Sequence, residues 1–342
     1  FGVLDRSQTT FGNLFKKAGY KTVVAGKWQL GKEKDSPQFF GFDESCLWQH
    51  QGGRTDEEDR DTRFSNPLIE YNGVAKRYTN GEFGPEIVSD YICDFIERNK
   101  DEPFFAYYPM LLTHCPFIPT PDSKDWDPKD MGSLTYKGDP AYFGDMVAYM
   151  DKVVGKIVSK LDTLGLRENT LIIFTGDNGT DQPIVSILNG KEYPGGKSKT
   201  TDNGTHVPLV VSWKGTALSG EVCDDLIDFS DILPTICEAA DVPIPSDFVL
   251  DGTSFIPQLM GEKGDPREWI YCWYNPREVK LQEFTRNKTY KLYTTGEFFN
   301  VRDDFFETTP LDLKELSDTE LKAHKSLKQA LNKYAHSRTI NE

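Results

Sequence analysis

Short, largely apolar segments alternate with amphipathic ones along the chain, and this alternation predicts its secondary structure. Residues 21–25, 104–108, 171–174 and 207–213 are runs of large apolar side chains that are rich in β-branched or aromatic residues. Each run has the length and composition of a strand that is buried on both faces, as in a parallel sheet. These runs therefore predict strands of one buried sheet.

Four further segments predict helices between these strands. Residues 85–99 and 139–164 carry apolar side chains every three or four positions, which is typical of amphipathic helices. Residues 9–18 begin with a threonine that can cap a helix, and residues 230–240 predict a short helix interrupted by Pro234. The alternation of strands and helices predicts an α/β fold, a doubly wound and mostly parallel sheet flanked by helices.

The pattern changes after residue 250. Short aromatic segments at 269–274, 290–295 and 298–301 predict a small antiparallel sheet, and a capping box formed by Ser317 and Glu320 predicts the start of a last helix. We therefore expect a larger α/β domain at residues 1–250, which would carry any catalytic site, and a C-terminal α+β subdomain at residues 251–342.

Residues 32–84 are polar and rich in glycine, aspartate and arginine, and they predict a long loop. The charged run at residues 56–61 has the composition of a solvated surface segment. A loop of this length in a compact domain is often functional, so we expect the part at residues 48–66 to shape substrate specificity. The composition of this segment does not indicate which substrate it would bind.

The overall charge limits the classes of partner. The 342 residues carry a net charge of −15, which argues against a nucleic-acid or anionic-membrane surface. The chain contains no apolar run of the length that spans a bilayer. An anionic small substrate would need a local basic pocket. The six cysteines show no metal-ligand spacing, and they leave the redox compartment open.

Polar residues that could bind a ligand or take part in catalysis follow several of the predicted strands. Asp177 and Asn178 come directly after the strand at 171–174, where α/β sheets bind ligands. Their carboxylate and amide oxygens suit Ca²⁺ or Mg²⁺, although the same residues also favour a simple tight turn. Lys27 follows the strand at 21–25 between two glycine residues and a tryptophan, and the alternative is a solvated surface charge.

Two more candidates have equally plain structural alternatives. His114 follows the strand at 104–108 and precedes Pro116, although a single histidine is more often structural than catalytic. Lys197 lies in the basic, glycine-rich segment 191–199, where Gly195 and Gly196 let the backbone approach an anion. The alternative for this segment is a flexible surface loop.

Taken together, these stretches resemble the sulfatase family of the alkaline-phosphatase-like superfamily over nearly the whole chain. Each motif alone is weak, but their shared order is specific. The segments that carry the resemblance are Gly19–Gly31, His114–Pro116, Gly176–Gly179, Gly196–Lys197, Asp202–Pro208, Trp213–Gly215, Asp228–Thr235 and Asp251–Ser254.

The resemblance implies a metal-assisted mechanism in which a formylglycine hydrate attacks sulfur. It implies that Asp177 and Asn178 bind the metal, usually Ca²⁺, with Mg²⁺ as the alternative. Lys27 and Lys197 would neutralise sulfate oxygens, and His114 would assist the departing alcohol. Fixed cations at these positions lower the barrier because sulfuryl transfer gathers negative charge on the oxygens.

The sequence departs from the family pattern in two places. Gln29 occupies the position of a family histidine, and glutamine cannot act as a general base at neutral pH. The Cys/Ser-x-Pro/Ala-x-Arg signature of the formylglycine segment is absent from the sequence, as are the paired N-terminal aspartates. We expect these parts upstream of residue 1, so that this chain alone is inactive and binds divalent metal weakly.

The leading hypothesis is therefore the hydrolysis of organic sulfate esters of an aryl or carbohydrate type. The implied partners are a sulfate ester substrate and a formylglycine-generating enzyme, with no nucleic acid or membrane, and family habit implies a secreted or periplasmic location. Two alternatives stay open: a phosphodiesterase or phosphonate hydrolase of the same superfamily, and an inactive domain that binds sulfated glycans.

Overall fold

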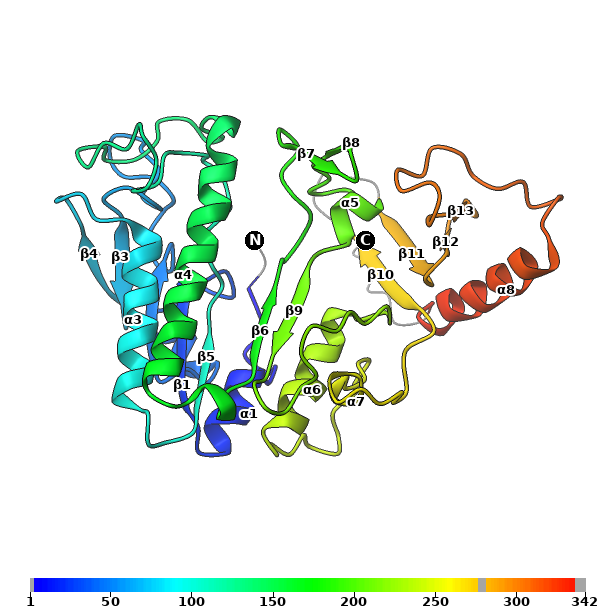
Figure 1. Cartoon of the computed structure of the whole chain (residues 1–342), viewed down its shortest axis with the longest axis horizontal. Helices are drawn as coiled ribbons and strands as arrows, with labels where there is room; N and C mark the ends of the chain where they lie inside the picture. Colours follow the sequence, from blue (N-terminus) through cyan, green and yellow to red (C-terminus); the bar gives the residue numbers. More distant parts are fainter. Residues whose placement is uncertain (1–2, 276–280, 336–342) are drawn as a thin grey trace. The chain divides into compact units, whose positions relative to one another are not determined.

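The computed structural model describes residues 3–275 and 281–335, and the chain divides into two compact units (Figure 1). The first unit comprises residues 1–170 and 241–245, and the second comprises residues 171–240 and 246–342. Each unit is considered by itself. The division into domains at residue 250 stays a prediction.

The first unit is built on a five-stranded mixed sheet with the strand order β4-β3-β2-β1-β5. Strand β1 (Lys21–Lys27) pairs in parallel with both β2 (Glu44–Trp48) and β5 (Phe104–Tyr107). Strands β3 (Leu68–Tyr71) and β4 (Val74–Arg77) continue the sheet in antiparallel pairing. The α/β class is confirmed, and among the named strands of the described residues the parallel pairs are those of β1 with β2 and β5.

Helices flank this sheet as predicted. Helix α1 (Phe11–Lys17) begins at a capping box formed by Thr10 and Asn13 and packs on β1. Helix α3 (Gly84–Arg98) packs on β1 and β2, and α4 (Phe143–Thr163) packs on α3 (Figure 1). The remaining short helical segments are α2 (Ser36–Phe39), η1 (Pro140–Tyr142) and η2 (Arg167–Asn169).

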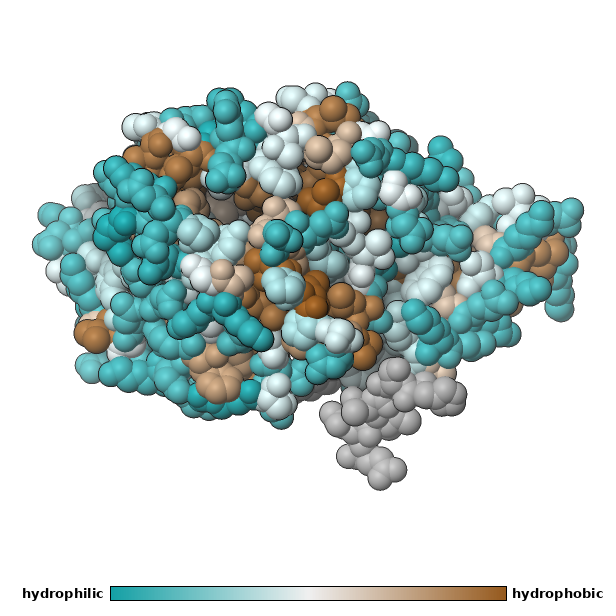
Figure 2. All heavy atoms as spheres, turned by 90° about the horizontal axis from the view of Figure 1, so that it is seen from below, coloured by the Kyte–Doolittle hydropathy of each residue, from teal (hydrophilic) through white to brown (hydrophobic). Residues whose placement is uncertain are grey.

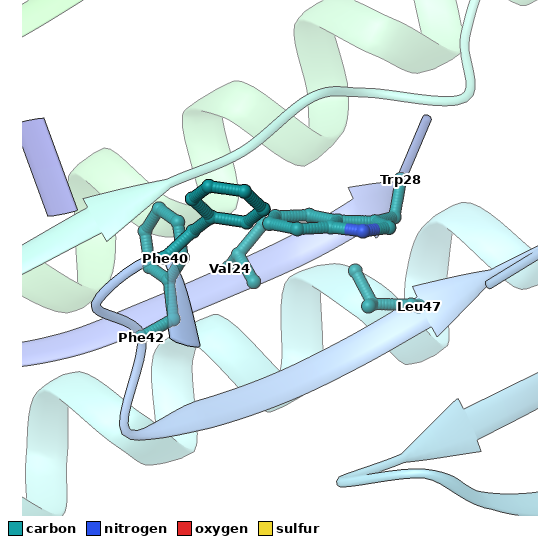
Figure 3. Close-up of a cluster of buried hydrophobic side chains, with 5 residues drawn as sticks. All are labelled: Val24, Trp28, Phe40, Phe42 and Leu47. Atoms are coloured by element: carbon teal, nitrogen blue, oxygen red, sulfur yellow. The ribbon is translucent and has the colours of Figure 1, made fainter. Parts of the chain in front are cut away.

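A buried aromatic cluster closes one face of the sheet in this unit (Figure 3). It joins Val24 of β1 and Leu47 of β2 to Trp28, Phe40 and Phe42, none of which is more than 3% exposed. The Trp28 and Phe42 rings meet edge to face with centroids 6.0 Å apart, an arrangement that aromatic quadrupoles favour. The cluster therefore fixes Trp28, which lies in the sequence between the candidates Lys27 and Gln29.

The prediction that residues 32–84 form one long loop is wrong. This stretch contains α2 and strands β2, β3 and β4. Its polar side chains find partners inside the fold: the Asn72 side chain accepts from the Ser45 backbone N–H at 2.8 Å, and Glu70, 4% exposed, accepts from the Gln51 N–H at 2.9 Å. Polar residues can occupy strands when their hydrogen bonds are satisfied in this way.

The second unit contains three small sheets. Strand β6 (Ile172–Thr175) pairs antiparallel with β9 (Leu209–Ser212), and β7 (Val185–Leu188) forms a hairpin with β8 (Lys191–Pro194). The predicted C-terminal antiparallel sheet is confirmed, with the order β10-β11-β12-β13. Its strands are β10 (Ile270–Tyr274), β11 (Gln282–Arg286), β12 (Tyr290–Tyr293) and β13 (Phe298–Asn300).

The helices of this unit are short except for the last. Helix α8 (Asp318–Lys333) begins at the predicted capping box of Ser317 and Glu320 and buries Leu327 and Leu331 against the C-terminal sheet. Pro234 lies in the first turn of α6 (Ile232–Ala239), where proline is tolerated, so it does not interrupt the helix. The others are α5 (Asp202–Thr205), η3 (Phe229–Asp231) and α7 (Ile256–Leu259).

Two further expectations in this unit are wrong, and one strand was not predicted. Strand β6 is half-buried and antiparallel to β9 rather than a parallel strand buried on both faces, because a short apolar run does not specify its partner. Part of the basic segment 191–199 is strand β8. Strand β11 was not predicted because its sequence is largely polar. Its Thr285 is nevertheless fully buried, and the hydroxyl donates to the Leu327 carbonyl.

The surface agrees with the acidic, polar composition. On the face shown in Figure 2, hydrophilic residues predominate and apolar side chains gather in smaller patches. Among the described residues, no helix combines the length and apolar character needed to cross a bilayer.

We expect Phe42→Ala to lower the free energy of unfolding by about 3–5 kcal/mol, because it opens a cavity in the aromatic cluster. Val74→Ala, at a strand position that is 64% exposed in the same sheet, serves as the control and should change little. Denaturant unfolding of both variants measures the difference. Equal losses for the two would show that the cluster does not carry the stability of this sheet.

Candidate functional site

Three of the candidate residues lie at or beyond the carboxyl ends of the parallel strands in the first unit. Lys27 is the last residue of β1, and Gln29 follows it. The Lys27 N–H donates to the Pro109 carbonyl at 2.9 Å, which joins the end of β1 to the segment between β5 and His114. Lys27 and His114 are half-buried, whereas Gln29 is exposed.

Gly26 makes this junction possible. Its φ of +127° lies in a region that side chains rarely adopt, and a Cβ at this position would meet the Pro109 carbonyl oxygen at 2.0 Å. Gly26 is therefore required by the backbone geometry at the end of β1, as well as being part of the Gly-Lys motif.

His114 is held in a turn, and its ring contacts a buried arginine. The His114 N–H donates to the Leu111 carbonyl at 3.0 Å, and Arg63 Nη1 contacts His114 Nδ1. The Arg63 side chain is 4% exposed, and its guanidinium lies 4.2 Å from the centre of the Trp48 ring. Burial lowers the pKa of Arg63, and the nearby Asp61 carboxylate opposes this effect.

The sequence analysis did not predict Arg63, because residue 63 lies in the stretch 32–84 that was expected to form one long loop. The arginine-aromatic pair Arg63-Phe64 is a local signal of burial there. Burial also raises the pKa of Asp61, although the charges of Arg63 and Arg54 oppose that shift.

The other three candidates lie on two loops of the second unit that are hydrogen-bonded to each other. The Lys197 N–H donates to the Thr180 carbonyl at 2.9 Å, and the Gly179 N–H donates to the Gly204 carbonyl at 2.9 Å. These bonds tie the loop of Asp177 and Asn178 to the loop of Lys197. Asp177 is exposed, and Asn178 and Lys197 are half-buried.

The C-terminal sheet supports the loop that follows Lys197. Lys291, 1% exposed, donates from Nζ to the Thr200 carbonyl and to Glu307 Oε1, the latter at 2.7 Å. Arg286 donates to Asp202 Oδ1 at 2.5 Å. Sequence patterns missed both cations, because their partners are remote in the sequence.

The metal assignment rests on two residues. The Asp177 carboxylate and the Asn178 amide are suitable oxygen donors for Ca²⁺, but Ca²⁺ takes six to eight oxygens. Among the residues that the structure describes, no group of three or more His, Cys, Asp or Glu could hold a metal ion. These residues therefore do not form a complete Ca²⁺ site by themselves.

The structure thus forms two groups, with Lys27, Gln29 and His114 in the first unit and Asp177, Asn178 and Lys197 in the second.

Lys291 should make stability depend on pH in an unusual direction. Burial lowers the pKa of Lys291 from its ordinary 10.5 to about 8, so between these values the unfolded chain binds more protons than the folded chain. The contribution of Lys291 to the free energy of unfolding therefore rises with pH in this window. We expect the melting temperature of the wild type, relative to Lys291→Met, to rise from about pH 8 to about pH 9.5.

Lys288→Met is the matched control, because Lys288 is 54% exposed and pairs with Asp225 on the surface. Its difference from the wild type should stay nearly constant over the same range. A wild-type advantage over Lys291→Met that shrinks as the pH rises would contradict the lowered pKa.

Comparisons with known proteins identify the family. The family model "Sulfatase" matches residues 2–242, and the model "N-sulphoglucosamine sulphohydrolase, C-terminal" matches residues 197–337. The uncharacterized sulfatase YdeN of Escherichia coli (strain K12) is 32% identical over 301 residues, which cover 80% of this chain and 52% of that protein. N-acetylgalactosamine-6-sulfatase of Mus musculus is 28% identical over 322 residues, covering 87% of this chain and 59% of that protein.

The same fold occurs in solved structures. The crystal structure of the PsFucS1 sulfatase from Pseudoalteromonas sp. matches with a TM-score of 0.71 and 23% identity, over 96% of this chain and 73% of that one. The chain spans about half the length of the curated relatives it matches. Since the sulfatase model covers more than half of the sequence, the chain belongs to the sulfatase family.

Proposed function

We propose that the protein containing this chain hydrolyses sulfate esters, and that its substrate is a sulfated carbohydrate. Membership of the sulfatase family carries this proposal. Two of the matches support a carbohydrate substrate rather than a simple aryl sulfate. They are the C-terminal family model of N-sulphoglucosamine sulphohydrolase and the mouse relative N-acetylgalactosamine-6-sulfatase.

The roles proposed for this chain are electrostatic. Lys27 and Lys197 neutralise the sulfate oxygens, and His114 assists the departing alcohol. Preorganised charges of this kind stabilise a transition state in which negative charge gathers on the oxygens, and they need no reorganisation during the reaction. The support for Lys197 is that its loop is held from two sides, by the Thr180 carbonyl and, through Thr200, by Lys291.

Sulfatases in general use a metal ion and a formylglycine residue. The metal binds the sulfate group, and the formylglycine supplies the nucleophile. Asp177 and Asn178 would contribute two ligands to such an ion. The sequence contains no formylglycine signature, so we assign neither the nucleophile nor a complete metal site to these residues.

Gln29 takes a more limited role in this proposal than the family histidine. Its amide can orient a hydroxyl group but cannot accept a proton as a base at neutral pH. A formylglycine-generating enzyme is the proposed maturation partner, and a secreted or periplasmic location is the proposed compartment.

We expect Lys197→Ala to lower kcat/KM for a sulfate ester by about 10²–10³-fold, the scale for losing one preorganised charge partner. The variant is made in the protein expressed from its whole reading frame together with a formylglycine-generating enzyme. Lys199→Ala is the matched control, because Lys199 is exposed in the same loop.

Sulfate and phosphate esters of the same alcohol are assayed in parallel, so that the alternatives are tested together. Near wild-type turnover in Lys197→Ala would refute the role of this lysine. A preference for the phosphate ester would favour a phosphohydrolase, and binding of sulfated glycans without turnover would favour a binding domain.

A further inference from the structure

Arg63 is a buried cation in contact with the candidate residue His114, and the proposed chemistry gives it no role. Its guanidinium lies over the Trp48 ring at 4.2 Å, and its Nη2 lies 3.5 Å from Asp61 Oδ2. Its Nη1 donates to the Cys115 carbonyl and also contacts His114 Nδ1. The guanidinium is thus fixed by an aromatic face, a carboxylate and a carbonyl before it meets the histidine ring.

The contact between the two side chains restricts the protonation of His114. A guanidinium has only N–H donors and stays protonated in proteins, so the ring nitrogen that faces it must offer a lone pair. Nδ1 of His114 is therefore the acceptor, and the proton of the neutral ring lies on Nε2. A doubly protonated ring would place an N–H group and a second positive charge against Arg63.

The carbonyl of Cys115 defines the competing state. It lies 2.6 Å from His114 Nδ1, close enough to accept a hydrogen bond from an Nδ1–H group. Arg63 opposes that bond, because its Nη1 presents a donor to Nδ1, and two N–H groups cannot point at each other favourably. Without the guanidinium, the Nδ1–H tautomer would gain the carbonyl as its partner, and Nε2 would lose its proton.

We propose that Arg63 is a positioning residue that holds His114 as a neutral ring with its proton on Nε2. In this state the Nε2–H group of His114 donates a hydrogen bond to the leaving-group oxygen as the sulfur–oxygen bond breaks, and the departing alkoxide takes its proton from water. The catalytic part of this inference rests on the proposed role of His114, whereas the tautomer itself does not. A lysine at position 63 would not reproduce the geometry, because an ammonium has no plane to lie over the Trp48 ring and no second nitrogen to face Asp61 while the first meets His114.

The test is the nitrogen NMR spectrum of the chain labelled with ¹⁵N-histidine. His114→Gln identifies the His114 resonances among those of the five histidines. In the wild type we expect Nδ1 to show the shift of an unprotonated ring nitrogen and Nε2 that of a protonated one. In Arg63→Met we expect the two to exchange character, because an Nδ1–H group can then donate to the Cys115 carbonyl that already lies beside it.

Arg60→Met is the control, because Arg60 belongs to the same segment but pairs with Asp56 and Glu58. It should leave the His114 shifts unchanged. Removal of Arg63 leaves the buried Asp61 carboxylate with the more exposed Arg54 as its ion-pair partner and can destabilise the fold, so Asp61→Asn/Arg63→Met is made alongside it. The wild-type spectrum alone also tests the inference, because it shows which ring nitrogen of His114 carries the proton.

A protonated Nδ1 in the wild type, or unchanged shifts in a folded Arg63 variant, would overturn the inference. The readout needs no turnover. A protein that fails to hydrolyse sulfate esters but shows the expected tautomer would refute the proposed function alone.

Discussion

The parallel pairing of β1 with β2 and β5 is the constraint on which the first unit depends. It directs Lys27, Trp48 and the segment that leads to His114 beyond the same ends of the strands. The close approach of Gly26 to Pro109 then sets the spacing between the end of β1 and that segment. A side chain at position 26 would force these backbones apart, and it would move Lys27 relative to the turn of His114.

Each unit uses a buried cation to hold the backbone near a candidate residue. Arg63 donates to the Cys115 carbonyl beside His114, and Lys291 donates to the Thr200 carbonyl beyond Lys197. Both cations lie near a carboxylate, Asp61 or Glu307, which compensates for the desolvation of the charge. A carbonyl held by a buried cation cannot exchange freely with water, so the loop that carries it keeps one conformation.

The sequence predicted those features whose causes are local. Capping boxes, amphipathic stripes and glycine-bounded apolar runs gave α1, α3, α4, α8 and β1, because each depends on neighbouring residues. It failed for β2, β3, β4 and β11, whose polar side chains are satisfied by remote partners. It failed in the same way for Arg63 and Lys291. The sequence analysis also failed to predict that β6 runs antiparallel to its neighbour, since strand direction depends on the partner strand.

Under the proposed function an acidic protein binds an anionic substrate, so the attraction between them must come from cations close to the substrate. A net charge of −15 repels an approaching sulfate, but salt screens this repulsion beyond about 8 Å at physiological ionic strength. Inside that distance the local cations decide the interaction. The half-buried Lys27 and Lys197 are partly removed from water, so the attraction that they exert is screened less than that of exposed lysines. Recognition of the sulfate would therefore depend on how rigidly the loops hold these cations, which is what Gly26 and Lys291 contribute.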